Sequence, residues 1–202
     1  MFVPFVFKYG EMNGGKSAKL LMTKHMYEST GKKVLIFKPS ADTRDGQFVQ
    51  SRALSEKVPA KLVTPKMMNW MYNEVKAYKP DVVLVDEAQF FQVHQIDELA
   101  RIVDLLDVPV IAHGLMADFK TELFPASKRL VEVGATLEKI EAVCSDCANP
   151  TTFNMRLFNG KPIFEGEQVQ VGGNESYKSV CRSCYLKAKA RAMQLDVSNG
   201  LS

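Results

Sequence analysis

One segment near the N-terminus, Gly10-Glu-Met-Asn-Gly-Gly-Lys16-Ser17, constrains the fold more than any other part of this sequence. It matches the pattern G-x-x-x-x-G-K-[ST], follows an apolar run at 2–9 and precedes a segment with helical periodicity. Glycines at these positions let backbone N–H groups surround phosphate oxygens, and the following helix adds its partial positive charge. A chance match in an average sequence of this length is expected about one per cent of the time. The segment therefore predicts a strand–loop–helix unit that binds a polyphosphate.

Short β-type runs alternate with helical patterns along the first three-quarters of the chain. Four strands are expected, at 2–9, 33–37, 81–85 and 108–112. Three helices are expected: one at 16–30 with Leu20, Leu21 and Met26 inward, one started by Thr64 and Pro65 with Met68, Met71 and Val75 inward, and one containing Ile96, Leu99, Ile102, Val103 and Leu106. Such alternation predicts a parallel sheet with helices on both faces. Together with the 10–17 loop, it predicts the α/β class of a P-loop NTPase (RecA-like) fold.

The bulk composition is that of a packed globular protein and limits the expected partners. Hydrophobic residues make up 46% of the 202 residues, charged residues 24%, and the net charge is +3. This charge is too small to predict nucleic-acid binding, which requires a concentrated basic surface. No apolar run approaches the roughly 18 residues of a membrane span, and the first residues lack the basic start of a signal peptide. A cytoplasmic protein without a membrane partner is expected.

Several side chains have the chemistry that phosphoryl transfer requires. Lys16 is expected to reach the β- and γ-phosphates of ATP, and the Ser17 hydroxyl to ligate Mg²⁺. Asp86 follows the apolar run 82–85 (VVLV), an arrangement in which a strand delivers a carboxylate to the metal ion. Glu87 comes next, and on an extended backbone its side chain diverges from that of Asp86. Glu87 is therefore the expected general base for an acceptor hydroxyl, and a solvated acidic turn is the alternative.

The tripeptide Asp42-Thr43-Arg44 lies directly beyond the second expected strand. In open α/β sheets, the carboxyl end of the strands carries the ligand crevice. An arginine there can stabilise charge on the transferring phosphoryl group, and Asp42 can support the metal ion through water. A surface ion pair within a loop is the alternative for these residues.

Two C-x-x-C pairs, Cys144/Cys147 and Cys181/Cys184, mark the C-terminal part of the chain. In a reducing compartment, two such pairs predict a structural Cys₄ zinc site with no open position for catalysis. Redox chemistry needs only one pair, and disulfides fit a cytoplasmic location poorly. The wide separation of the pairs predicts a long loop between them. The three histidines show no comparable spacing and are expected at the surface or packed, not as ligands.

The ordered set of motifs resembles one known family. The segments GEMNGGKS, DTR, DEAQFF, GLMADF…LF, C-x-x-C and VGGNESYKSVCRSC occur in the same order as in the tetrameric, zinc-containing thymidine kinases of bacteria, phages and animal cytosol. The resemblance runs from about residue 5 to residue 185. Each motif except the 10–17 loop is weak by itself, whereas the ordered set is very specific. At Asn13 and Gly14 the family often has Phe or Tyr and then Ser or Ala.

The resemblance implies a role for each matching residue. Glu87 would take the proton from the nucleoside 5′-hydroxyl, Gln89 would sit beside the sugar, and Tyr177 would contribute from a loop that closes over the base. The residues implied to bind ATP and its Mg²⁺ are Gly10, Met12, Asn13, Gly14, Gly15, Lys16, Ser17, Ala18, Asp42, Arg44, Asp86 and Gln89. The residues implied to contact thymine are Met12, Phe90, Leu115, Phe119, Phe124, Val169, Gln170, Val171 and Tyr177. The phenylalanines and Met12 also suit an ordinary core.

The composition and pattern of the sequence change after about residue 141, where cysteines appear and β-type runs shorten. We therefore expect a P-loop ATP-binding α/β domain at 1–141, a small zinc-ribbon/lasso domain with the nucleoside-covering loop at 142–190, and a C-terminal tail at 191–202. The run KAKARAM is expected to be helical. The reaction implied by the resemblance transfers the γ-phosphoryl group of ATP to the 5′-hydroxyl of thymidine, with deoxyuridine as a second acceptor. A homotetramer and feedback inhibition by dTTP are implied as well.

Two other hypotheses remain open at this point. One is a zinc-containing P-loop ATPase that acts on nucleic acid, with the zinc ribbon as its grip on DNA or RNA. The small size and the net charge of +3 disfavour it. The other is a kinase that has lost its activity and senses nucleotides, which the intact Lys16, Asp86 and Glu87 disfavour.

Overall fold

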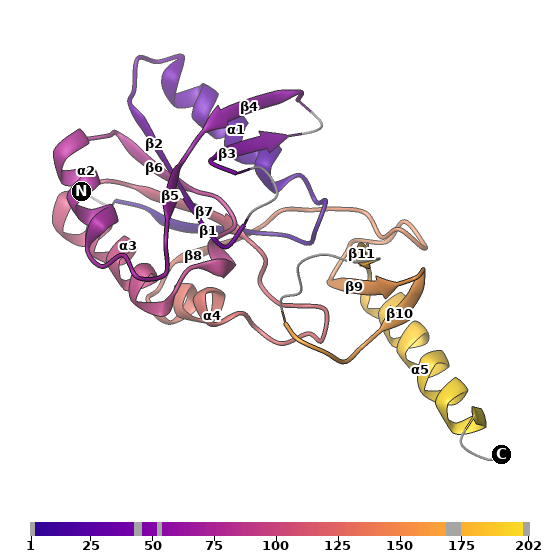
Figure 1. The fold of residues 1–202 in the computed structure, drawn as a ribbon. Helices are drawn as coiled ribbons and strands as arrows, with labels where there is room; N and C mark the ends of the chain where they lie inside the picture. The colour runs from indigo at the N-terminus through magenta and orange to yellow at the C-terminus, as the bar shows by residue number, and fades with distance from the viewer. Residues whose placement is uncertain (1–2, 43–45, 52–53, 169–174, 200–202) are drawn as a thin grey trace. The chain divides into compact units, whose positions relative to one another are not determined.

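The computed structural model describes residues 3–42, 46–51, 54–168 and 175–199 (Figure 1). Contacts within the chain divide it into two compact units. The first unit comprises Met1–Gly10, Gly15–Met116 and Phe124–Ile140, and the second comprises Glu11–Gly14, Ala117–Leu123 and Glu141–Ser202. None of the helices in the described ranges combines the length and the hydrophobicity that crossing a bilayer requires.

A six-stranded sheet in which all neighbours are parallel forms the centre of the first unit, in the order β5-β2-β6-β7-β1-β8. Its strands are β1 (Phe5–Tyr9), β2 (Val34–Pro39), β5 (Lys61–Val63), β6 (Val82–Val85), β7 (Val110–Gly114) and β8 (Thr136–Lys139). The central strand β6 (VVLV) is aliphatic and buried throughout, because a parallel sheet buries both of its faces. Parallel pairing also brings the carboxyl ends of all six strands to one edge. The predicted parallel sheet is confirmed.

Helices cover both faces of this sheet (Figure 1). They are α1 (Lys16–Glu28), α2 (Trp70–Tyr78), α3 (Val93–Leu106) and α4 (Pro125–Glu132), with a single 3₁₀ turn, η1 (Ala88–Phe90). On one face α1 packs near Leu84, together with an antiparallel hairpin of β3 (Phe48–Ser51) and β4 (Glu56–Pro59). On the other face α2, α3 and α4 cover Val85. Successive residues of β6 thus enter different cores, as strand geometry requires. The α/β fold class of a P-loop NTPase is confirmed.

The second helix does not begin where its expected cap lies. Thr64 and Pro65 form a turn, and α2 begins at Trp70. The Thr64 carbonyl, which a helix starting there would use, instead accepts hydrogen bonds from the N–H of Met67 (3.1 Å) and from Nε2 of Gln95 (2.8 Å). The prediction of a helix start at Thr64 and Pro65 is therefore wrong. The side chain of Gln95 in α3 donates a hydrogen bond to the Thr64 carbonyl oxygen, which the first helical turn would need as an acceptor.

Two methionines expected in the core are exposed, Met68 at 66% and Met26 at 65%. Met71 and Val75 are buried on one face of α2, as predicted. Met68 precedes α2 and therefore does not lie on that face. In α1 the inward row reaches Tyr27, and the neighbouring Met26 points about 100° away from it. The error at Met68 comes from the start of the helix, and the error at Met26 comes from the position of the residue around its helix.

The second unit contains a three-stranded antiparallel sheet in the order β10-β9-β11, followed by one long helix (Figure 1). These elements are β9 (Phe153–Phe158), β10 (Lys161–Ile163), β11 (Glu175–Val180) and α5 (Arg182–Asn199). The small core of this unit includes Met155 of β9, Tyr185 of α5 and two of the cysteines. Because side chains alternate along a strand, Asn154 and Arg156 lie on the opposite face of β9 from Met155. The helix predicted from KAKARAM is confirmed as part of α5.

Candidate active site

The loop between β1 and α1 has the backbone geometry that its glycines allow. Gly15, directly before the first residue of α1, has a φ of 83°, a left-handed conformation that favours glycine. At Gly14 a Cβ would lie only 2.9 Å from the carbonyl oxygen of Glu11, which accepts a hydrogen bond from the Gly14 N–H (3.1 Å). The first turn of α1 has N–H groups without helical partners, which suits an anion. The 10–17 segment thus has the tight turn, helix start and Lys16 side chain of a phosphate-binding loop.

Asp86 is a buried carboxylate at the carboxyl edge of the sheet. It follows β6 and is 4% exposed, and within the described part of the chain its Oδ1 has no hydrogen-bond partner. Burial, and then the charge of Glu87, raise the pKa of Asp86 to about 7, although Lys38 and Lys16 act in the opposite direction. A buried carboxylate oxygen of this kind suits a hard cation. With the hydroxyl of Ser17, Asp86 offers the oxygen donors that Mg²⁺ prefers.

Glu87 is oriented by a buried glutamine. Nε2 of Gln89 donates a hydrogen bond to Oε2 of Glu87 (2.6 Å), and Oε1 of Gln89 accepts one from the N–H of Leu115 (2.9 Å). The second bond determines which end of the Gln89 amide faces Glu87. Glu87 itself has φ 49° and ψ 45°, so the extended backbone expected here is wrong. Glu87 thus adopts a left-handed backbone conformation, and its carboxylate meets the side chain of Gln89.

Asp42 belongs to a buried ion pair. Its Oδ2 lies 3.1 Å from Nζ of Lys38, and both side chains are almost fully buried. Nζ of Lys38 also donates a hydrogen bond to the carbonyl oxygen of Phe48 (3.0 Å). The charge of Asp42 contributes to the raised pKa of Asp86, so the two carboxylates act on one another. The alternative of a surface ion pair does not hold for Asp42, and Arg44 lies outside the described residues.

Three apolar residues lie close to the Glu87–Gln89 pair. The rings of Phe90 and Phe124 meet edge to face, with centroids 5.9 Å apart and an interplanar angle of 80°. Leu115 follows β7 and is held at both backbone groups: its N–H donates to Gln89, and its carbonyl oxygen accepts from Oγ of Ser127 (2.6 Å). These residues supply a rigid apolar surface within the first unit.

In the second unit, polar residues of β9 hold three other expected contact residues. The N–H of Met12 donates to Oδ1 of Asn154 (2.7 Å). The guanidinium of Arg156 lies 3.8 Å from the centroid of the Phe119 ring, and its Nε donates to the hydroxyl of Tyr177 (2.7 Å). Met12, Phe119 and Tyr177 thus have defined positions within this unit.

The four cysteines converge within the second unit. The Sγ atoms of Cys144, Cys147, Cys181 and Cys184 all lie within 4.8 Å of one another. Four sulfurs at about 2.3 Å from a tetrahedral Zn²⁺ would lie about 3.8 Å apart. Burial raises the pKa of Cys144, but hydrogen bonds from backbone N–H groups, that of Asp146 first, outweigh it and lower the pKa to about 6. The pKa of Cys181 is lowered as well, chiefly by the backbone N–H of Cys184, and four clustered thiols, two of them biased toward the thiolate, fit a structural zinc site.

Comparison with known proteins identifies the family. A sequence model of the family described as "Thymidine kinase" matches residues 4–185 of this chain. The chain belongs to the thymidine kinase family. It is 42% identical over 181 residues to the thymidine kinase of Streptococcus gordonii, and the aligned region covers 90% of this chain and 95% of that protein. For the thymidine kinase of Lactococcus lactis the identity is 43% over 181 residues, with coverages of 90% and 96%.

A third relative and one solved structure complete the comparison. The thymidine kinase of Enterococcus faecalis is 42% identical over 184 residues, covering 91% of this chain and 94% of that protein. The structure of the replication initiator DnaA bound to AMPPCP and single-stranded DNA aligns with a TM-score of 0.41 and 20% identity, over 70% of this chain and 41% of that chain. That similarity is too low to bear on function.

The residues that the resemblance assigns to ligand binding in this thymidine kinase family member fall into three groups. The first unit contains Gly10, Gly15, Lys16, Ser17, Ala18, Asp42, Asp86, Glu87, Gln89, Phe90, Leu115 and Phe124. The second unit contains Met12, Asn13, Gly14, Phe119, Tyr177 and the four cysteines. Outside the described residues lie Arg44, Val169, Gln170 and Val171.

Three buried polar residues beside these groups were not predicted: Lys38, Asn154 and Arg156. Their signal in the sequence is weak, a single lysine in VLIFKP and polar residues at alternate positions of FNMRLF. Such a pattern indicates a polar face on a strand. It does not indicate the partner, because the partners of these side chains include residues far away in the sequence.

Proposed function

We propose that this chain transfers the γ-phosphoryl group of ATP to the 5′-hydroxyl of thymidine and so forms dTMP for pyrimidine salvage. The observation that carries the proposal is a pair of adjacent carboxylates in different environments. Asp86 is buried with an oxygen that lacks a hydrogen-bond partner among the described residues, whereas Glu87 is half-buried and oriented by Gln89. A kinase needs one carboxylate for the metal ion and another for the acceptor hydroxyl. Identities of 42% and 43% to thymidine kinases support thymidine as that acceptor.

The donor nucleotide is held by the loop and by cationic side chains. Backbone N–H groups of Gly10–Ala18 surround the phosphates, and Lys16 and Arg44 neutralise charge on the transferring group. Mg²⁺ bound by Ser17 and Asp86, with Asp42 nearby, would polarise the β- and γ-phosphate oxygens. Oδ1 of Asp86, which finds no hydrogen-bond partner in the described part of the chain, supports this assignment.

Glu87 acts as the general base. As the 5′-hydroxyl oxygen attacks the γ-phosphorus, its proton moves to the Glu87 carboxylate, and ADP leaves with the electron pair of the broken P–O bond. The hydrogen bond from Gln89 orients the carboxylate before the acceptor binds, so less freedom is lost on the way to the transition state.

Thymine is recognised by apolar side chains and by backbone groups. The residues proposed to contact thymine are Met12, Phe90, Leu115, Phe119, Phe124, Tyr177 and the backbone of Val169, Gln170 and Val171. Flat apolar side chains suit the faces of a pyrimidine, and backbone donors and acceptors can recognise its edge. Deoxyuridine is a second acceptor, because it lacks only one methyl group, worth about 1–3 kcal/mol in a tight pocket.

The zinc has a structural role in this proposal. Its cysteines lie before β9 and after β11, so the metal anchors both ends of the loop that covers the nucleoside. The corresponding domains are the P-loop domain at 1–141, the zinc domain at 142–190 and the tail at 191–202. A cytoplasmic homotetramer inhibited by dTTP follows from the resemblance, and light scattering on purified protein tests the tetramer.

The central test is the substitution Glu87→Gln, which keeps the shape of the side chain and removes the base. Purified protein is incubated with Mg·ATP and each common nucleoside, and Asp104→Asn, at an exposed position of α3, is the matched control. Wild type and control should form dTMP, and Glu87→Gln should reduce kcat by about 100-fold or more. Zinc-loaded wild type that phosphorylates no nucleoside would refute the proposal, and ATPase activity stimulated by DNA would then select the nucleic-acid alternative.

A further inference from the structure

Arg156, at the centre of β9, is the largest of the fully buried side chains among the described residues, with 1% exposure. A charged side chain is almost never buried to this extent unless its donors are matched. Arg156 also lies on the face of β9 opposite Met155, away from the core that contains the cysteines. Its burial therefore has a cause other than the packing of the zinc-binding core.

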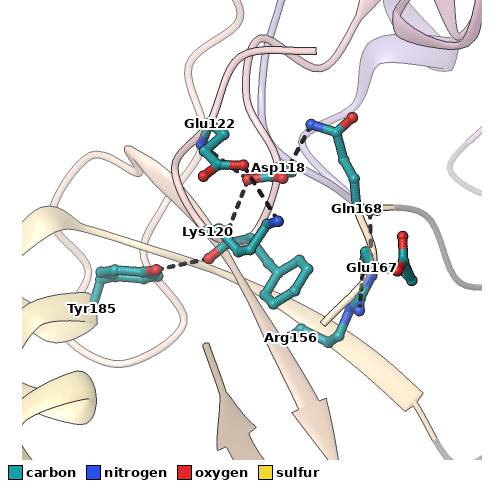
Figure 2. A network of polar contacts seen from close by, with 8 residues as sticks. Asp118, Lys120, Glu122, Arg156, Glu167, Gln168 and Tyr185 are labelled. Atoms are coloured by element: carbon teal, nitrogen blue, oxygen red, sulfur yellow. Dashed lines mark hydrogen bonds and ion pairs between the residues drawn. The ribbon is translucent and has the colours of Figure 1, made fainter. Parts of the chain in front are cut away.

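The guanidinium holds the chain on both sides of 169–174. Nη1 donates to the carbonyl oxygen of Glu167 (3.0 Å) and Nη2 to that of Gln168 (3.3 Å), as Figure 2 shows. Nε donates to the hydroxyl of Tyr177 (2.7 Å), on the other side of that segment. Three nitrogens of one planar group thus serve three separate acceptors. These contacts join the backbone at 167–168 to Tyr177 of β11 through one side chain.

The same guanidinium also positions the turn that carries Phe119. Its carbon lies 3.8 Å from the centroid of the Phe119 ring, and the Phe119 carbonyl oxygen accepts a hydrogen bond from the hydroxyl of Tyr185 (2.7 Å). The neighbouring Asp118 accepts a hydrogen bond from Nε2 of Gln168 (3.1 Å) through Oδ2, and its Oδ1 accepts two backbone N–H bonds within the turn (Figure 2). The turn and the chain at 167–168 are therefore joined twice, once through Asp118 and once through Arg156.

We infer that Arg156 is a positioning residue for nucleoside binding, which sets Phe119, Tyr177 and the backbone at 167–168 in the arrangement that receives the base. The inference rests on the proposed function, in which Phe119 and Tyr177 contact thymine. Arginine is required here because it combines a flat face for the Phe119 ring with three nitrogens that donate in different directions. Lysine keeps the positive charge but offers a single nitrogen and no planar face.

The substitution Arg156→Lys tests the inference, and Arg101→Lys is its matched control. Arg101 also places its guanidinium over an aromatic ring, that of Tyr72 at 5.0 Å, and donates to a side chain, but it lies in α3 and is exposed. Four quantities are measured in each variant: KM for thymidine, KM for ATP, bound zinc, and amide hydrogen exchange of the peptide 157–168 without nucleoside. In Arg156→Lys we expect KM for thymidine to rise about tenfold or more, with faster exchange in the peptide. KM for ATP and the zinc content should match those of Arg101→Lys.

The outcomes separate this inference from the proposed function. Unchanged exchange and unchanged KM for thymidine would overturn the role of Arg156, and so would parallel losses of zinc and ATP binding, which indicate a residue needed for folding alone. If wild type phosphorylates no nucleoside, the proposed function fails, yet the exchange measurement still decides whether Arg156 anchors 167–168. Should Arg156→Lys not fold, Tyr177→Phe removes only the hydroxyl acceptor. It should then accelerate exchange in 157–168 with zinc retained, and unaltered exchange would overturn the inference.

Discussion

The substitution Gln89→Glu measures how much turnover depends on the orientation of Glu87. The two side chains have nearly the same shape, so Oε1 can still accept from the Leu115 N–H, 2.9 Å away in the wild type. The Nε2 donor 2.6 Å from Oε2 of Glu87 becomes an oxygen, and attraction turns into repulsion between carboxylates. A hydrogen bond to a charged group contributes about 1.5–3 kcal/mol. If this stabilisation is lost in the transition state, kcat falls roughly 10- to 150-fold.

The assay for Gln89→Glu is the initial rate of dTMP formation at saturating Mg·ATP and thymidine. Gln50→Glu, at an exposed glutamine of β3 that takes part in no proposed contact, introduces the same chemical change and should leave kcat unaltered. A kcat for Gln89→Glu within about twofold of the wild type would show that the 2.6 Å hydrogen bond does not orient a catalytic base. An equal loss in Gln50→Glu would show that the added charge, not the lost donor, is responsible.

Two further predictions concern buried titratable groups. Lys38→Met removes the ion-pair partner of Asp42 in a buried site and should lower the free energy of unfolding by about 3–5 kcal/mol in urea titrations. Lys61→Met, in the more exposed pair with Glu74, should cost about 1 kcal/mol or less, and equal losses would contradict the argument from burial. At His113, burial and then Lys8 lower the pKa to about 3 from an ordinary 6.5, so only the unfolded chain takes up this proton between those values. Stability relative to His113→Leu should therefore fall as pH drops below about 6.5, by up to about 1.4 kcal/mol per pH unit, and a pH-independent difference would refute this.

The elements predicted correctly from the sequence are those in which local pattern and tertiary packing agree. The run VVLV became β6, buried on both faces, and the periodic apolar residues of 96–106 became the inward face of α3. The start of α2 failed because Gln95, 31 positions away from Thr64, takes up the carbonyl that the first helical turn would need. A capping pattern describes only the residues beside it, so it could not reveal that contact.

The candidate site divides in the same way. Lys16, Asp86 and Glu87 were identified from motifs, and the structure brings them into one electrostatic cluster at the carboxyl edge of the sheet. The backbone of Glu87 was expected to be extended and is left-handed, which changes the neighbour that its carboxylate meets. Lys38 and Arg156 were missed, because a lone charged residue in a strand usually faces solvent.

The sequence by itself determined which chemical groups this protein has for its reaction: a phosphate-binding loop, two adjacent carboxylates and four thiols. These groups are recognisable because loop conformation and ligand chemistry depend on residues that are close together in the chain. Only the tertiary structure decided how Glu87 is oriented by Gln89 and Leu115, and how Arg156 spans the two sides of 169–174. The physical reason is that a buried hydrogen bond or ion pair depends on the exclusion of water and on partners that folding brings from distant positions. A local sequence pattern predicts neither of these.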